Sequence, residues 1–264
     1  MNIFLFELKA YRKTNIVWAL SLIAGMSFFM SLFPTFARDA AEINRMLQAY
    51  PEAVRKALGL TVDLATLLGY YSYVMLFVLL SGSIQAMNLG LSIISKETRH
   101  KTADFLLTKP VKRNRVLASK IAAAATSMAL TGICYMAAAY FTALFVKVGP
   151  FDTRIFFLLS LTLFFMQMIF LSLGFLVAII FTRIKSVLSI SLGTVFGFFI
   201  INMLGSIVGE KTLRYITPFK YFDFIFIIKN GSYELNFVLL GALVTAAAFS
   251  LSFIIYSRKD INTV

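Results

Sequence analysis

Long apolar segments alternate with short polar ones along the whole chain. Six apolar segments reach the roughly 17 to 25 helical residues needed to cross a hydrocarbon core, and none of them contains Asp, Glu, Lys or Arg. Ten-residue stretches of alternating polarity, the pattern of membrane β-barrels, do not occur. The sequence therefore predicts an all-α integral membrane protein, a single transmembrane domain over 1–264. Its six predicted transmembrane helices are Ile16–Phe33, Tyr70–Ile94, Ile121–Val146, Ile155–Phe181, Val187–Val208 and Leu235–Tyr256.

Composition agrees with this prediction and excludes several other classes. Only 14% of the residues are charged, against roughly 25% in a soluble domain. The first apolar segment is too long for a signal peptide and lacks a small-residue cleavage site before Arg38, so we expect it to stay as an anchor. The chain has one cysteine, Cys134, and one histidine, His100. These counts exclude a disulfide framework and a cysteine-based metal site, and we expect no metal.

The net charge of +13 raises the possibility of nucleic-acid binding, and the distribution of the charges decides against it. Membrane proteins concentrate Lys and Arg in their cytoplasmic segments. With the N-terminus inside, 15 basic residues are cytoplasmic and 10 lie outside. We therefore expect a multi-pass protein of the cytoplasmic membrane with both termini cytoplasmic and no nucleic-acid partner. The cytoplasmic segments are 1–15, 95–120, 182–186 and 257–264, and the outer ones are 34–69, 147–154 and 209–234.

Two further stretches are predicted to lie at the membrane surface. Residues 213–228 are apolar and aromatic but are interrupted by Pro218 and are too short to span. They predict a re-entrant or interfacial pair of short helices within the outer segment 209–234. The alternative, a seventh span, places the C-terminus outside. Residues 1–15 predict a cytoplasmic interfacial helix that leads into the first span.

The cytoplasmic segment 95–120 contains a short amphipathic pattern. Ala103, Leu106, Leu107 and Pro110 fall at i, i+3, i+4 and i+7, on one face of a helix surrounded by basic residues. Pro110 disfavours a helical conformation at the residue before it and so ends the helix. Such a helix either lies in the lipid headgroup layer or docks into a groove of a partner.

The order of residues in this segment, between the second and third of six helices, resembles the coupling helix of permease subunits of type-2 ATP-binding-cassette exporters. Lys101 replaces the Gly usual before the Thr in that family. The stretches Tyr50–Gly59 and Tyr215–Asp223 resemble the family's first outer loop and its segment before the last helix. The resemblance covers essentially the whole chain. The coupling residues it implies are Glu97, Thr102, Phe105, Leu106, Leu107, Pro110, Arg113 and Lys120.

The resemblance implies a transporter subunit rather than an enzyme. ATP and Mg²⁺ are then held by a separate ATPase subunit, and a second permease copy or a homologue completes the transporter in the lipid bilayer. A phosphate-binding loop needs Lys straight after its second Gly, and in Gly205–Thr212 Glu210 intervenes, so this chain is predicted to bind no nucleotide. The alternatives are a channel or secondary carrier that uses no ATP, and a structural membrane anchor of a complex. Spans without ionisable residues disfavour ion-coupled transport.

Small and polar residues within the spans give two further expectations. Gly193, Gly197, Gly205 and Gly209 follow one another on one helix face and permit close helix packing, either within the chain or at a dimer interface. Gln167 and Asn202 lie in the middle of their spans. Each either forms hydrogen bonds between helices or lines a substrate path.

Overall fold

The computed structural model describes residues 3–57, 62–99, 113–181, 184–208 and 211–258. These residues form helices and connecting turns, without a strand. Six helices are long and apolar enough to cross a membrane, as predicted. The elements are α1 (Ile3–Ser31), α2 (Phe33–Arg38), α3 (Ala40–Gln48), α4 (Glu52–Ala57), α5 (Leu67–Arg99), α7 (Arg113–Val146), α8 (Thr153–Ile180), α9 (Val187–Val208), α10 (Lys211–Ile216), η1 (Pro218–Lys220), α11 (Phe224–Asn230) and α12 (Leu235–Arg258).

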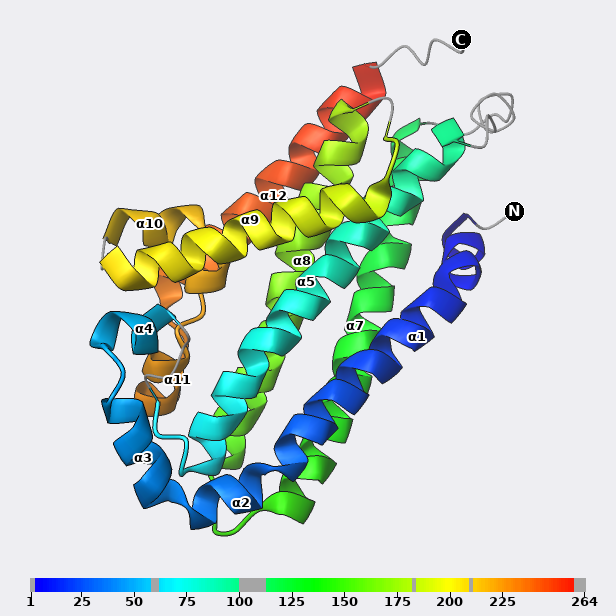
Figure 1. The fold of residues 1–264 in the computed structure, drawn as a ribbon. Helices are drawn as coiled ribbons and strands as arrows, with labels where there is room; N and C mark the ends of the chain where they lie inside the picture. The colour runs from blue at the N-terminus through cyan, green and yellow to red at the C-terminus, as the bar shows by residue number, and fades with distance from the viewer. Residues whose placement is uncertain (1–2, 58–61, 100–112, 182–183, 209–210, 259–264) are drawn as a thin grey trace.

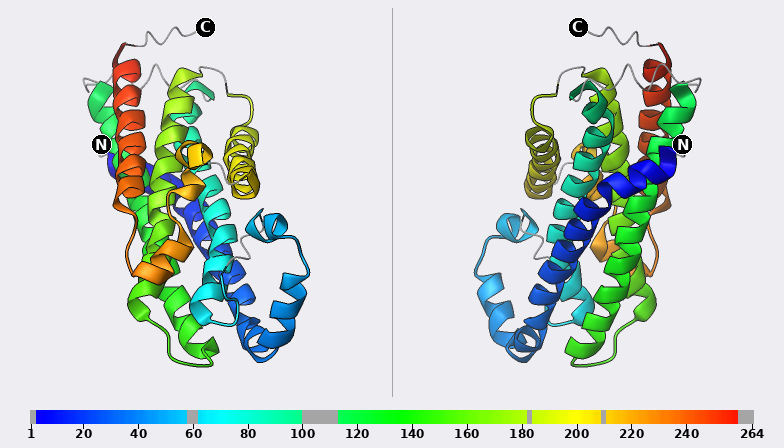
Figure 2. Two further views of the ribbon diagram at one scale, coloured as in Figure 1. Left: turned by 90° about the vertical axis from the view of Figure 1, so that its left-hand side faces the viewer. Right: turned by 90° about the vertical axis from the view of Figure 1, so that its right-hand side faces the viewer.

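The long helices form a bundle with α5 and α8 at its centre (Figure 1). Helix α1 packs along α7, and α12 packs on α8. Helix α9 crosses the bundle on one side, and α4 packs against it. The start of α1, the end of α5, the start of α7 and the end of α12 all lie at one end of the bundle. Helices α2 and α3 lie at the other end (Figures 1 and 2).

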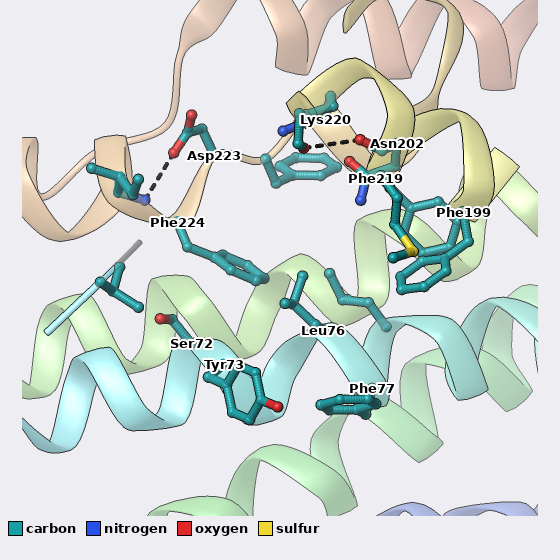
Figure 3. Close-up of a pocket in the computed structure, with 16 residues that line it drawn as sticks. Ser72, Tyr73, Leu76, Phe77, Phe199, Asn202, Phe219, Lys220, Asp223 and Phe224 are labelled. Carbon is teal, nitrogen blue, oxygen red and sulfur yellow. Dashed lines mark hydrogen bonds between the residues drawn. The ribbon is translucent and has the colours of Figure 1, made fainter. Parts of the chain in front are cut away.

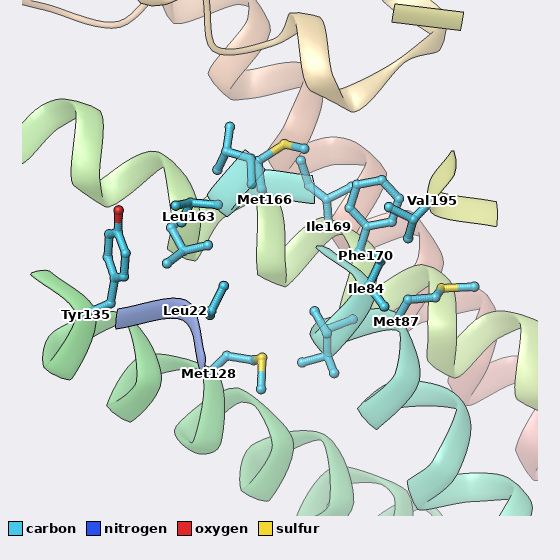
Figure 4. Close-up of a cluster of buried hydrophobic side chains, with 14 of the residues drawn as sticks. Leu22, Ile84, Met87, Met128, Tyr135, Leu163, Met166, Ile169, Phe170 and Val195 are labelled. Atoms are coloured by element: carbon cyan, nitrogen blue, oxygen red, sulfur yellow. The ribbon is translucent and has the colours of Figure 1, made fainter. Parts of the chain in front are cut away.

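The core of the bundle is apolar and is formed by residues of α8 and of the helices around it. Leu22, Met87, Met128, Phe170 and Val195 come from five different helices and are all buried (Figure 4). In the spans of α5 and α8, 72% and 61% of the residues are buried, against 17% to 28% in the other four. The outer four helices therefore present broad apolar surfaces. Exposure of such surfaces to water is unfavourable, so we expect lipid or another membrane subunit to cover them.

Two glycines allow α5 and α8 to approach closely. A Cβ atom added at Gly90 would lie 2.6 Å from the carbonyl oxygen of Leu171, and one added at Gly174 would lie 2.7 Å from the carbonyl oxygen of Met87. Both oxygens belong to the backbone, so they cannot move aside as the end of a flexible side chain can. The central helix pair therefore depends on the absence of side chains at both positions.

The surface segments follow the sequence prediction in part. Residues 211–230 form short helical pieces, α10, η1 and α11, separated near Pro218, and no seventh span occurs among the described residues. Asp223 begins α11, its Oδ1 accepting hydrogen bonds from the backbone N–H groups of Ile225 and Phe226 at 2.8 and 3.2 Å. Gly231 ends it with φ of 60°, a conformation that favours glycine. At the N-terminus, the expected interfacial segment continues without a break into the span as α1.

Candidate functional site

A buried cluster of three charged residues joins α1, α5 and α7 at the end of the bundle where α5 stops and α7 begins. Glu7 is only 3% exposed, and Lys120 is fully buried. The Nζ atom of Lys120 donates hydrogen bonds to Glu7 Oε1 at 2.8 Å and to the carbonyl oxygen of Ile93 at 2.9 Å. The ammonium of Lys96 donates to the other Glu7 oxygen. Each carboxylate oxygen of Glu7 thus pairs with a lysine from a different helix.

Lys96 also contacts aromatic rings of α1. Its Nζ atom lies 5.4 Å from the ring centroid of Phe6 and 5.2 Å from that of Tyr11, within the range of cation–π attraction. Residues on both sides of Glu7 therefore hold the end of α5. Because both lysines pair with one carboxylate, the first two turns of α1 determine how far apart the ends of α5 and α7 can lie.

Of the predicted coupling residues, the structure describes Glu97, Arg113 and Lys120. Thr102, Phe105, Leu106, Leu107 and Pro110 fall outside the described residues. Glu97 lies in the last turn of α5, and Arg113 is the first residue of α7. Lys120, predicted from the resemblance to belong to the coupling set, is buried on α7, and its ammonium donates to Glu7. Its contact with a partner subunit stays a prediction, whereas its contact with Glu7 is direct.

Sequence analysis did not single out Glu7. The available signal was that Glu7 is the sole acid in a segment whose other charges, Lys9, Arg12 and Lys13, are basic. Hydropathy gives no information on which helices come together, so Glu7 was indistinguishable from an exposed acid in an interfacial helix.

Gln167 lies in a polar chain inside the bundle. Its Nε2 atom donates to Gln85 Oε1 at 3.1 Å, and Gln85 Nε2 donates to Thr131 Oγ1 at 3.4 Å. These bonds link α8, α5 and α7, and all three side chains are buried. Of the two interpretations of Gln167, interhelix hydrogen bonding is therefore the one seen in this chain.

Asn202 lies instead on a cavity of about 220 Å³ between α5, α9, η1 and α11 (Figure 3). Asn202 is 9% exposed, and its side-chain amide has no hydrogen-bond partner among the described residues. The walls are mostly aromatic. The rings come from Tyr73, Phe77, Phe199, Phe219, Phe222 and Phe224.

Lys220 and Asp223 complete the lining of this cavity. Burial lowers the pKa of Lys220 below its ordinary value, an effect that nearby Arg214 strengthens and Asp223 opposes. Within the described part of the chain, the Lys220 ammonium has no ion pair or hydrogen bond. The Lys220 ammonium, the Asn202 amide and the Asp223 carboxylate thus line the same, largely aromatic cavity.

The backbone around Lys220 is firmly held. Arg214 donates from Nε to the Lys220 carbonyl oxygen at 3.2 Å and pairs with Glu234 at 2.7 Å. Thr217 Oγ1 donates to the carbonyl oxygen of Phe198 on α9 at 2.9 Å. These contacts fix η1 against α9, so the position of Lys220 at the cavity does not depend on its own side chain.

The glycines of α9 were predicted to pack either within the chain or at a dimer interface, and two of them do not pack within the chain. A Cβ atom added at Gly193 or Gly197 would meet nothing within 4 Å, whereas one at Gly205 would lie 3.2 Å from Leu213 Cβ. Gly209 falls outside the described residues. Packing within the chain is therefore wrong for Gly193 and Gly197, while a dimer interface stays a prediction. Gly90 and Gly174 lie against the backbone of a neighbouring span. They are four residues from Ala86 and Ala178, in a small-x-x-x-small spacing that sequence analysis overlooked.

Chemistry that needs a clustered metal finds no support in this geometry. Among the described ranges, no three His, Cys, Asp or Glu side chains come together.

A family model described as "ABC-2 family transporter protein" matches residues 1–261. The chain belongs to the ABC-2 transporter family. A search of curated proteins gave no match.

Family membership confirms the resemblance seen in the sequence and places the protein in a membrane. In this family the chain is the membrane-embedded permease component of a transporter, a role that implies a partner ATPase. In the sequence, Lys96 precedes and Lys120 follows the segment 100–112, and both pair with Glu7.

Proposed function

We propose that this chain is the permease subunit of an ATP-driven exporter, in which a separate ATPase docks on the segment between α5 and α7. The observation that carries the proposal is the family match over residues 1–261, on a chain whose own sequence lacks a phosphate-binding loop. ATP and Mg²⁺ would be bound by the ATPase. In the proposed orientation, both termini and the segment 95–120 face the cytoplasm.

The buried cluster gives this docking a mechanical consequence. Movement of the coupling segment by the ATPase displaces the ends of α5 and α7. Both ends are tied through Lys96 and Lys120 to Glu7, so α1 moves with them. Because α5 contacts α9 as well as α8, the displacement reaches the cavity at Asn202. We infer that this is how ATP binding changes access to a substrate.

A second permease, either an identical copy or a homologue, completes the proposed transporter. Support for it comes from α9, whose Gly193 and Gly197 face open space and whose span is only 22% buried. A flat glycine face on a helix with little intrachain packing suits close contact with another helix.

The test is affinity purification of the tagged permease from its native membranes in a mild detergent. The proposal expects a soluble ATPase to co-purify and to hydrolyse ATP in the eluate. Elution of the permease without any ATPase, together with transport that continues in ATP-depleted vesicles, would contradict it and favour a secondary carrier.

A further inference from the structure

The cavity at Asn202 has the features of a binding site. Asn202, 9% exposed as a residue, lines the cavity, and its amide has no hydrogen-bond partner among the described residues. The amide is therefore available to a ligand without breaking a contact within the protein. Lys220 adds an ammonium that has no ion pair or hydrogen bond within the described part of the chain.

We propose that this cavity binds an aromatic carboxylate, either a small acid or the acidic end of a larger molecule. Its carboxylate accepts hydrogen bonds from the Asn202 amide and the Lys220 ammonium, and its ring lies among Phe199, Phe219 and Phe222. Figure 3 shows Asn202 and Lys220 close together on one wall with aromatic side chains around them.

The donors that remain available point to an anion. The hydroxyls of Ser72 and Ser206, which also line the cavity, donate within their own helices to the carbonyl oxygens of Gly69 and Asn202 at 2.7 and 2.9 Å. Oδ1 of Asp223 already accepts two backbone N–H groups of α11. The Lys220 charge is therefore a donor free to meet a ligand, and hydrogen bonds between charged partners are the strong ones.

The volume and the walls restrict the apolar part of the ligand. Ligand pockets usually enclose roughly 300 to 1,000 Å³, so a cavity of about 220 Å³ holds one small ring system. Offset or edge-on contacts with phenylalanine rings favour an aromatic group over a simple chain of the same size. Phe170 and Phe199 already contact Phe219 edge-on or tilted, which holds its ring in place.

The claim that such a ligand is the transported substrate rests on the proposed function. The claim that the cavity binds it does not. The test therefore uses the permease alone, in nanodiscs of zwitterionic lipid, without ATPase. The probe is 2-naphthoate, followed by saturation-transfer NMR and equilibrium dialysis. Empty nanodiscs correct for partition into lipid, and 2-methylnaphthalene is the uncharged analogue.

Saturable binding of 2-naphthoate, and much weaker binding of 2-methylnaphthalene, is expected for the parent. Lys220→Met keeps the aliphatic stem and should weaken 2-naphthoate binding roughly tenfold or more, the equivalent of one charged hydrogen bond. Asn202→Ser should weaken it less. Lys229→Met removes an exposed lysine of neighbouring α11 and should leave binding unchanged.

Several results would overturn the inference. One is unchanged binding of 2-naphthoate to a Lys220→Met variant whose thermal unfolding matches that of the parent. Another is equal binding of the uncharged analogue. Saturable binding of 2-naphthylmethylamine that is tighter than that of naphthoate would assign the site to cations through Asp223. None of these results bears on co-purification of an ATPase, so the two proposals fail separately.

Discussion

Glu7 Oε1 lies 2.8 Å from Lys120 Nζ, although 113 residues separate the two in the sequence. Both side chains are buried, and Lys96 pairs with the second oxygen of the same carboxylate. The contact joins the start of the chain to the helix that follows the coupling segment. A buried ion pair of this kind contributes little net stability by its existence, but the loss of one partner leaves an uncompensated charge.

The first prediction is that Lys120→Met destabilises the permease, because Glu7 Oε1 and the carbonyl oxygen of Ile93 lose their buried donor. Lys96 still pairs with the carboxylate, so the loss should stay below the about 3 to 5 kcal/mol of a fully stranded buried charge. Thermal unfolding of the detergent-solubilised protein measures it. Lys9→Met removes an exposed lysine of α1, the helix of Glu7, and is the matched control that should melt like the parent. Adding Glu7→Gln to Lys120→Met should recover part of the loss, because it removes a buried carboxylate that has lost one of its two lysines. Independent, additive effects of the two changes would contradict the pairing.

A second prediction compares two glycine positions. Gly90→Ala places a Cβ 2.6 Å from a backbone oxygen of α8 and should cost about 1 to 3 kcal/mol, as overpacking does. Gly193→Ala meets open space and should leave the melting temperature unchanged. Equal melting of the two variants would mean that α5 and α8 do not pack as closely as described.

The dimer interface gives a third prediction. A Cβ atom added at Gly197 meets nothing within 4 Å in the single chain, so we expect the Gly197→Leu monomer to stay folded. Close packing of α9 against a second copy would be lost, and size-exclusion chromatography with light scattering should show a shift from dimer to monomer. Ala242→Leu on α12, also at an exposed position, is the control. A dimer that persists in Gly197→Leu would place the interface elsewhere.

The fourth prediction concerns sidedness. In a Cys134→Ala background, a cysteine at position 101 should be protected from a membrane-impermeant maleimide in intact cells, and one at position 148 should be labelled. The expectation rests on the excess of Lys and Arg in 95–120. The opposite pattern would reverse the orientation. The background change is needed because Cys134 is exposed on its helix.

The fifth prediction separates docking from attachment to lipid. Burial of a large apolar side chain in an ATPase groove contributes roughly 1.5 to 3 kcal/mol, and Leu106→Asp also places a carboxylate there. Leu106→Asp should therefore lose the co-purifying ATPase while the permease still inserts and dimerises. Replacing Lys109, Lys112, Arg113 and Arg115 with Gln should have the smaller effect. If those replacements abolish ATPase association and Leu106→Asp does not, the segment binds through charge.

Hydropathy predicted the six spans because a bilayer imposes length and apolarity on each helix separately. The helices extend beyond the predicted spans. Residues 1–15 were predicted as an interfacial helix leading into the first span, and α1 runs from Ile3 through both; α7 begins at Arg113, before the span predicted from Ile121. A helix continues past the hydrocarbon core without needing apolar residues. Contacts between helices, such as Glu7 with Lys120 or Gly90 with Leu171, depend on rotation and register, about which a single sequence carries little information. Asn202 was a candidate for the substrate path, but only the fold brings it to Lys220.

The link between Glu7 and Lys120 also has a consequence for how the protein is made. Ribosomes add roughly 5 to 20 residues per second, so the 113 residues that follow Glu7 up to and including Lys120 take about 6 to 23 s to synthesise. Until then, Lys96 is the lysine of the cluster that Glu7 can meet. The full set of contacts at the start of α1 therefore forms only after the beginning of α7 has been made. The earliest part of the chain to leave the ribosome waits for a later one before its position is fixed.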